Sequence, residues 1–90
     1  MMRKVLYNNR YGDNIIFEQI DNEIHMSGFN MEWLRIGYDN EKNITMVDPS
    51  GGPYLSIGMN LGLYFNDKRS SIIENIKIEE NKIIFKTKTK

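Results

Sequence analysis

This chain of 90 residues is built from short runs in which apolar and polar residues alternate, separated by clusters rich in Asn, Gly and Asp. In the run 14–20, for example, Ile15 and Phe17 fall on one face of an extended strand and Glu18 falls on the other. A period of two is typical of a β-strand with one buried face and does not suit an amphipathic helix. Ala, the best helix former, is absent. The pattern therefore predicts an all-β protein.

About seven short strands are expected, in a small antiparallel sandwich or a partly open barrel. No linker interrupts the chain, so residues 1–90 are expected to form a single domain. The runs that resemble strands are 3–7, 14–20, 23–27, 44–47, 54–57 and the two arms of a closing hairpin over 72–87. In this hairpin, Ile76, Ile78, Ile83 and Phe85 are expected to share one buried face with Ile72 and Thr87.

Two stretches leave the choice of strand or helix open. In 29–38, Phe29, Met31 and Trp33 alternate as in a strand, but the phase changes between Trp33 and Leu34. This change indicates a bulge or a strand that is buried on both faces, and a helix is the alternative. In 59–65, Gly62 weakens either structure. The expected aromatic core residues are Phe17, Phe29, Trp33, Phe65 and Phe85.

Charge and composition exclude several classes of protein. Twelve Lys and Arg residues balance twelve Asp and Glu residues, which argues against a general binder of polyanions. Lys86, Lys88 and Lys90 could contact phosphates, or could protect an edge strand from aggregation.

The apolar runs are two or three residues long, so we expect no membrane segment, no signal peptide and a cytoplasmic location. Because the core is small and the net charge is zero, a homodimer or a higher oligomer is the expected assembly.

The segment Asp48-Pro49-Ser50-Gly51-Gly52-Pro53-Tyr54 is the candidate binding site. Its glycines let a ligand approach the backbone, and successive N–H groups could bind an anion. The alternative is a sharp connection between strands, with Asp48 bonded to its own loop backbone. No Gly-Lys-Ser/Thr sequence follows, so the segment is not a phosphate-binding P-loop. The predicted binding residues are Asp48, Ser50, Gly51, Gly52 and Tyr54.

The segment 47–58 resembles a motif of small uncharacterised proteins of bacteriophage and prophage type. That motif has the form Asp-Pro-(Ser/Asp)-Gly-Gly-Pro, followed by two positions that are mostly apolar and by a Gly a few residues later. Small proteins of this kind often neutralise host machinery or its signals, so the resemblance implies an accessory binding role. It carries no catalytic residue over to this chain.

No catalytic or metal site and no cofactor is expected. His25 is the single histidine, and no partner stands at a recognisable spacing for acid–base catalysis or metal binding. The serines lack a Gly-x-Ser-x-Gly elbow, and the carboxylates Asp39, Glu41, Glu79 and Glu80 fall in predicted turns. The chain is therefore expected not to be an enzyme.

Three functions remain, in order of preference. The first is a phage-type inhibitor that blocks a host protein partner, such as a defence protein, through an exposed patch rich in tyrosine. The second is a protein that sequesters a small anionic ligand, such as a nucleotide, in a concave pocket at Gly51 and Gly52. The third is a nucleic-acid binder. The candidate interface tyrosines are Tyr7, Tyr11, Tyr38, Tyr54 and Tyr64.

Overall fold

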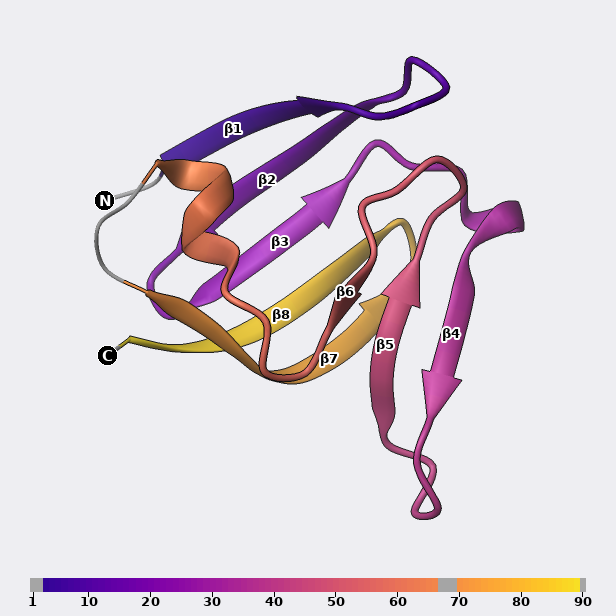
Figure 1. Ribbon diagram of the computed structural model, residues 1–90, viewed down its shortest axis with the longest axis vertical. Coiled ribbons are helices and arrows are strands. Elements are labelled where there is room, and N and C mark those ends of the chain that lie inside the picture. The colour runs from indigo at the N-terminus through magenta and orange to yellow at the C-terminus, as the bar shows by residue number, and fades with distance from the viewer. Residues whose placement is uncertain (1–2, 67–69, 90) are drawn as a thin grey trace.

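A computed structural model describes residues 3–66 and 70–89 and confirms the all-β class. Eight strands form two antiparallel sheets that do not close into a barrel (Figure 1). The first sheet has the strand order β1-β2-β3-β8-β7, and the second has the order β4-β5-β6. The strands are β1 (Arg3–Asn8), β2 (Asn14–Ile20), β3 (Glu23–Ser27), β4 (Arg35–Tyr38), β5 (Ile44–Asp48), β6 (Leu55–Ser56), β7 (Ser71–Glu79) and β8 (Lys82–Thr89).

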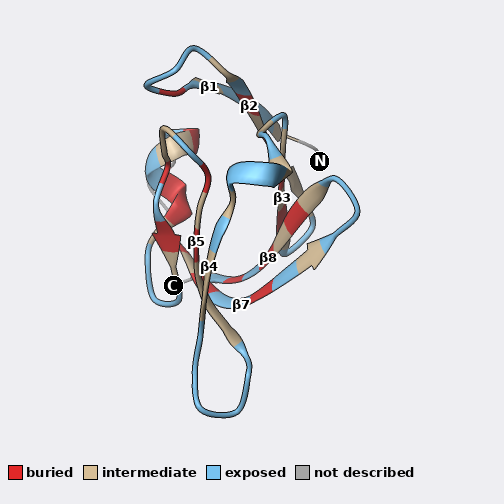
Figure 2. Ribbon diagram, turned by 90° about the vertical axis from the view of Figure 1, so that its right-hand side faces the viewer, coloured by how far each residue is buried: buried red, intermediate tan, exposed pale blue. Residues whose placement is uncertain are grey.

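A row of apolar residues crosses the larger sheet from edge to edge. The register places Val5 opposite Phe17, Phe17 opposite Met26, Met26 opposite Ile83, and Ile83 opposite Ile78. Since these residues share one face, they cover it with a continuous apolar surface. Figure 2 shows how the buried positions recur along the strands.

The smaller sheet and a short helix supply the other side of the core. Val47 on β5 and Leu55 on β6 are buried, as are Leu61 and Phe65 on the 3₁₀ helix η2 (Leu61–Phe65). The Asn60 side chain begins η2 by accepting a hydrogen bond from Gly62 N–H at 2.9 Å. Neither short helix in the described part of the chain has the length and apolar character that a membrane span needs.

The expectation for Trp33 is wrong. The stretch 29–38 divides into the 3₁₀ helix η1 (Met31–Trp33) and β4, and Trp33 is 64% exposed. Asn30 accepts a hydrogen bond from Glu32 N–H at 3.0 Å, and this local bond starts a tight turn in place of a strand. Phe29 is half-buried against the core, whereas Phe17, Phe65 and Phe85 are buried as expected.

The closing hairpin is confirmed, with one change of phase in its first arm. Ile76 pairs with Phe85 and Ile78 with Ile83, as expected, but the register shifts between Ile73 and Asn75. The bulge turns Ile73 into the core in place of Ile72, which is half-buried. The 54–57 strand is also shorter than expected, because pairing with β5 is limited to Leu55 and Ser56.

Candidate ligand-binding pocket

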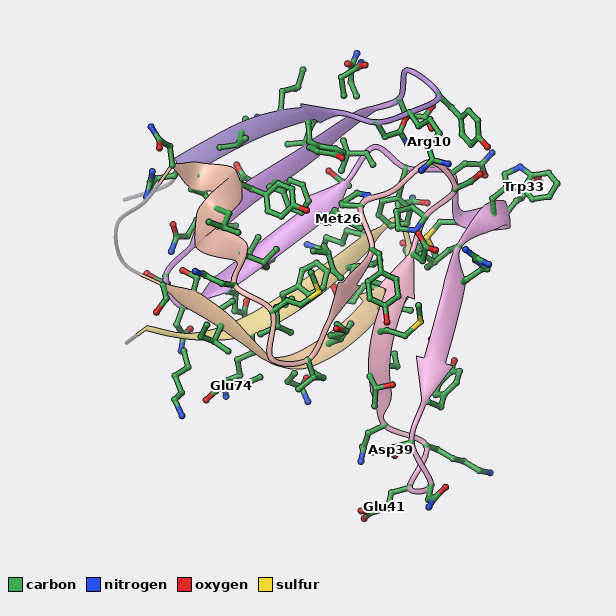
Figure 3. All side chains as sticks on the ribbon, in the orientation of Figure 1. Arg10, Met26, Trp33, Asp39, Glu41 and Glu74 are labelled. Carbon is green, nitrogen blue, oxygen red and sulfur yellow. The ribbon has the colours of Figure 1, made fainter. Side chains whose placement is uncertain are left out.

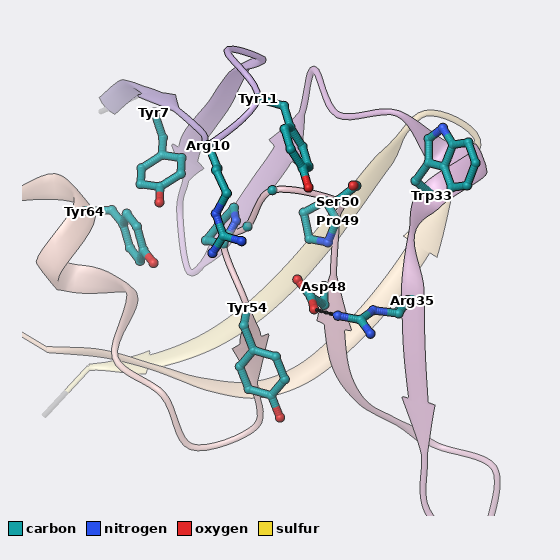
Figure 4. Close-up of a pocket in the computed structure, with 13 residues that line it drawn as sticks. Tyr7, Arg10, Tyr11, Trp33, Arg35, Asp48, Pro49, Ser50, Tyr54 and Tyr64 are labelled. Carbon is teal, nitrogen blue, oxygen red and sulfur yellow. Dashed lines mark hydrogen bonds and ion pairs between the residues drawn. The ribbon is translucent and has the colours of Figure 1, made fainter.

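A pocket of about 660 Å³ lies where the glycine-rich loop (residues 48–54) meets the β1–β2 loop (residues 9–13) (Figure 4). We call it the loop pocket. All five residues predicted from the sequence line it: Asp48, Ser50, Gly51, Gly52 and Tyr54. The rest of its lining comes from Tyr7, Arg10, Tyr11, Trp33, Arg35, Pro49, Pro53 and Tyr64.

The two glycines serve a tight turn. Gly52 N–H donates to the Pro49 carbonyl at 2.9 Å, and Gly51 and Gly52 have φ angles of +88° and +90°. A Cβ atom on Gly51 would lie 2.8 Å from Tyr11 Cδ2, so no larger residue fits without movement. The turn that the sequence predicted is therefore formed, and it packs tightly against the neighbouring loop.

Asn9 connects the two loops through hydrogen bonds, although no pattern in the sequence marks it for this role. Asn9 is 5% exposed, and its Oδ1 accepts hydrogen bonds from Tyr11 N–H at 3.0 Å and Asp13 N–H at 2.9 Å. Its Nδ2 donates to the Ser50 carbonyl at 3.0 Å. Arg10 N–H adds a bond to the Gly51 carbonyl at 3.1 Å. Asn9 therefore holds Arg10 and Tyr11 beside a segment 41 residues away.

The glycine-rich loop turns two carbonyl groups toward the β1–β2 loop and leaves two N–H groups without an acceptor among the described residues. The carbonyls of Ser50 and Gly51 accept from Asn9 and Arg10. By contrast, the N–H groups of Ser50 and Gly51 donate no hydrogen bond to any described residue. These two groups are donors that an anion could use.

Hydrogen-bond donors gather at one end of the loop pocket. The Arg10 guanidinium makes no ion pair or hydrogen bond within residues 3–66 and 70–89, and Figure 4 shows it reaching between Tyr64 and the glycine-rich loop. Tyr7 and Tyr64 lie beside it, with ring centroids 5.6 Å apart. Burial, and secondly the neighbouring Tyr7, raise the pKa of the Tyr64 hydroxyl, which therefore remains a proton donor at neutral pH.

Exposed aromatic rings surround the rest of the loop pocket. Tyr11, Trp33 and Tyr54 are 67%, 64% and 53% exposed. They come from the β1–β2 loop, from η1 and from the glycine-rich loop, and Figure 4 shows them on different sides of the opening. Such rings can stack on a planar ligand or contact a protein partner. The sequence identified Tyr11 and Tyr54 as interface residues, but it placed Trp33 in the core.

Asp48 binds Arg35 and not its own loop backbone, which corrects the expectation for that side chain. Asp48 Oδ2 lies 2.6 Å from Arg35 Nη2, across the pairing of β4 and β5. The Asp48 side chain is largely buried, whereas the Arg35 side chain is exposed. The loop pocket therefore contains an ion pair in addition to the unpaired Arg10.

His25 lies away from the loop pocket. It is on one face of β3, and Ile24 and Met26 are on the other, buried face. Its Nε2 is 3.2 Å from Glu23 Oε1 and its Nδ1 is 3.4 Å from Lys82 Nζ, so both ring nitrogens have partners. Among the described residues, no group of three or more acidic or histidine side chains is placed to hold a metal ion.

The C-terminal lysines do not protect an edge strand. Lys86 and Lys88 belong to β8, which lies between β3 and β7, so the expected edge position is wrong for them. Lys90 falls outside the described residues. None of the lysines on β8 lines the loop pocket.

No protein family, curated protein or solved structure matches this chain.

Proposed function

We propose that this protein is a non-enzymatic binding protein that sequesters a small organic anion of the nucleotide class in the loop pocket. The Arg10 guanidinium carries the proposal, because it has no ion-pair or hydrogen-bond partner among the described residues and lies in a concave site beside exposed aromatic rings. An arginine can bind a phosphate through two parallel hydrogen bonds. The concave shape favours a small ligand over a flat protein surface.

The lining of the loop pocket offers groups for both parts of a nucleotide. Arg10 and the hydroxyls of Tyr7 and Tyr64 supply donors for a phosphate, together with the free N–H groups of the glycine-rich loop. Tyr11, Trp33 and Tyr54 supply rings for a base, and stacking on such a ring contributes about 1–3 kcal/mol. A protein that holds such a ligand without changing it would remove a signal, which agrees with the phage-type resemblance of residues 47–58.

Calorimetric titration with AMP, GMP and UMP tests the proposal. Adenosine and inorganic phosphate serve as half-ligands, that is, as the nucleoside without phosphate and the phosphate without nucleoside. We expect at least one nucleotide to bind more tightly than either half-ligand. Arg10→Gln should weaken binding at least about tenfold, and Tyr54→Ala should cost about 2 kcal/mol, with the fold intact. Lys4→Gln is the matched control, since Lys4 is an exposed cation on β1 outside the loop pocket. Absence of binding by all three nucleotides would contradict the proposal.

The exposed rings also favour a second candidate, a phage-type inhibitor that occupies a host protein. Tyr11, Trp33 and Tyr54 are aromatic anchors of the kind that dominate protein interfaces. A pull-down from bacterial lysate followed by native mass spectrometry tests this function. A protein partner should be lost with Trp33→Ala and retained with Arg10→Gln, whereas a small anion should show the opposite dependence on Arg10.

A further inference from the structure

We infer that the loop pocket selects a ligand with a single phosphate group over one with a polyphosphate chain, and that Asp48 sets this limit. The inference rests on the proposed function, because it concerns the ligand of the same pocket. Two arginines line the pocket together with one carboxylate, so one positive charge, that of Arg10, is uncompensated. That charge suits one phosphate group and leaves further phosphates without a cation.

The second arginine is not free to bind a ligand. Arg35 and Asp48 are directly opposite each other on β4 and β5, and their side chains meet at 2.6 Å. The strand pairing therefore holds the ion pair in place. Since Asp48 is the largely buried partner and Arg35 the exposed one, the carboxylate is the member of the pair that is fixed within the fold.

Asp48 limits the negative charge that the loop pocket can hold, because it neutralises the second arginine. In Figure 4, the Arg35 side chain meets Asp48, and both residues line the same pocket as Arg10. Further phosphates would therefore share the pocket with the Asp48 carboxylate and would find no second free cation among its lining residues. Uncompensated repulsion of this kind is strong enough to decide between such ligands.

The test is calorimetric titration of the full chain with AMP and with ATP, in low salt and without magnesium. Wild-type protein should bind AMP at least about tenfold more tightly than ATP, since low salt leaves the repulsion unscreened. Asp48→Asn keeps the shape and an acceptor for Arg35, and it should raise the affinity for ATP about tenfold with less change for AMP. Arg35→Gln leaves Asp48 uncompensated and should increase the preference for AMP.

Glu41→Gln is the matched control, because Glu41 is an exposed acid at the far end of the β4–β5 hairpin (Figure 3). It should leave both affinities unchanged. If AMP binds but ATP binds equally well or better, the charge limit is wrong and the proposed function stands. If neither binds, the proposed function fails, and the inference fails with it. If the Asp48→Asn variant does not fold, Arg35→Gln tests the role of Asp48 instead, because it should increase the preference for AMP over ATP.

Discussion

Asn9 uses both ends of its side-chain amide, and this explains how two loops that are distant in sequence form one site. Its oxygen accepts two backbone N–H groups of its own loop, and its nitrogen donates to the carbonyl of Ser50. All of these bonds are removed from bulk water, since Asn9 is buried. A buried amide with its bonds made stabilises one arrangement strongly, because any other arrangement leaves the same groups unpaired.

Asn9→Ala should therefore lower the free energy of unfolding by roughly 1–3 kcal/mol, because it leaves buried backbone groups unpaired. The same change should weaken ligand binding, because Arg10 and Tyr11 lose their fixed position beside the glycine-rich loop. Urea unfolding and calorimetric titration give the two values. Asn8→Ala is the control, since Asn8 is the preceding residue and its side-chain bonds are exposed. Equal losses from the two variants would show that Asn9 does not fasten the loops.

The predictable part of the site is the part that depends on local chemistry. Pro49 and the glycines at 51 and 52 specify a tight turn whatever surrounds them, so the position of the glycine-rich loop followed from the sequence. The role of Arg10 could not be predicted from the sequence. Its place in the pocket depends on the hydrogen bond between Asn9 and Ser50, and alternation within a strand carries no information on such contacts. Arg35 was missed for a similar reason, since its partner is set by the β4–β5 register.

At the scale of the elements, the hairpins are the best predicted parts of the fold. The β2–β3 hairpin, and the β7–β8 hairpin next to its turn, alternate regularly, so the register of Phe17 with Met26 and of Ile78 with Ile83 follows from the pattern. The bulge in β7 could not be predicted, since an extra residue near Glu74 changes the phase without a Gly or Pro to mark it. The same holds for η1, where one side-chain bond of Asn30 outweighs the alternation of Phe29, Met31 and Trp33.

Phe85 tests the buried face of the closing hairpin. It is fully buried, and its neighbours across the sheet are Ile24 and Ile76. Phe85→Ala should lower the free energy of unfolding by about 3–5 kcal/mol, a large part of the stability of a small domain. Ile84→Ala is the matched control, because Ile84 directly precedes Phe85 on β8 and lies half-buried on the opposite face. Urea or thermal unfolding that gives the same small loss for both variants would contradict the register.

At the scale of the whole molecule, the pocket is a product of how the two sheets meet. The larger sheet brings Tyr7 and the β1–β2 loop, and the smaller sheet brings Arg35 and Asp48 (Figure 1). The class of fold could be predicted because alternation is repeated in most segments. The division into five and three strands could not, because β6 has two residues and the pairing of β3 with β8 joins segments far apart in the sequence.

The strand edges lead to the last prediction, a homodimer formed through β1. This strand ends the larger sheet, and among the described residues its backbone forms hydrogen bonds with β2 alone. The opposite edge, β7, is partly covered by backbone bonds of Gly58 and Met59 to Ile73 and carries Glu74 and Glu79. Leu6 is 61% exposed on β1, and an exposed apolar side chain on an unpaired strand edge favours pairing with a second copy.

Light scattering over a range of concentrations should give twice the chain mass of 10.6 kDa at the upper end. Leu6→Lys should shift the protein toward the monomer, because two copies of the new charge would meet in a symmetric pairing of β1 with itself. Leu63→Lys is the control, since Leu63 is an equally apolar, exposed residue but lies on η2. A mass of one chain at every concentration would exclude the dimer. A dimer that survives Leu6→Lys and is lost with Leu63→Lys would instead move the interface from the β1 edge to η2.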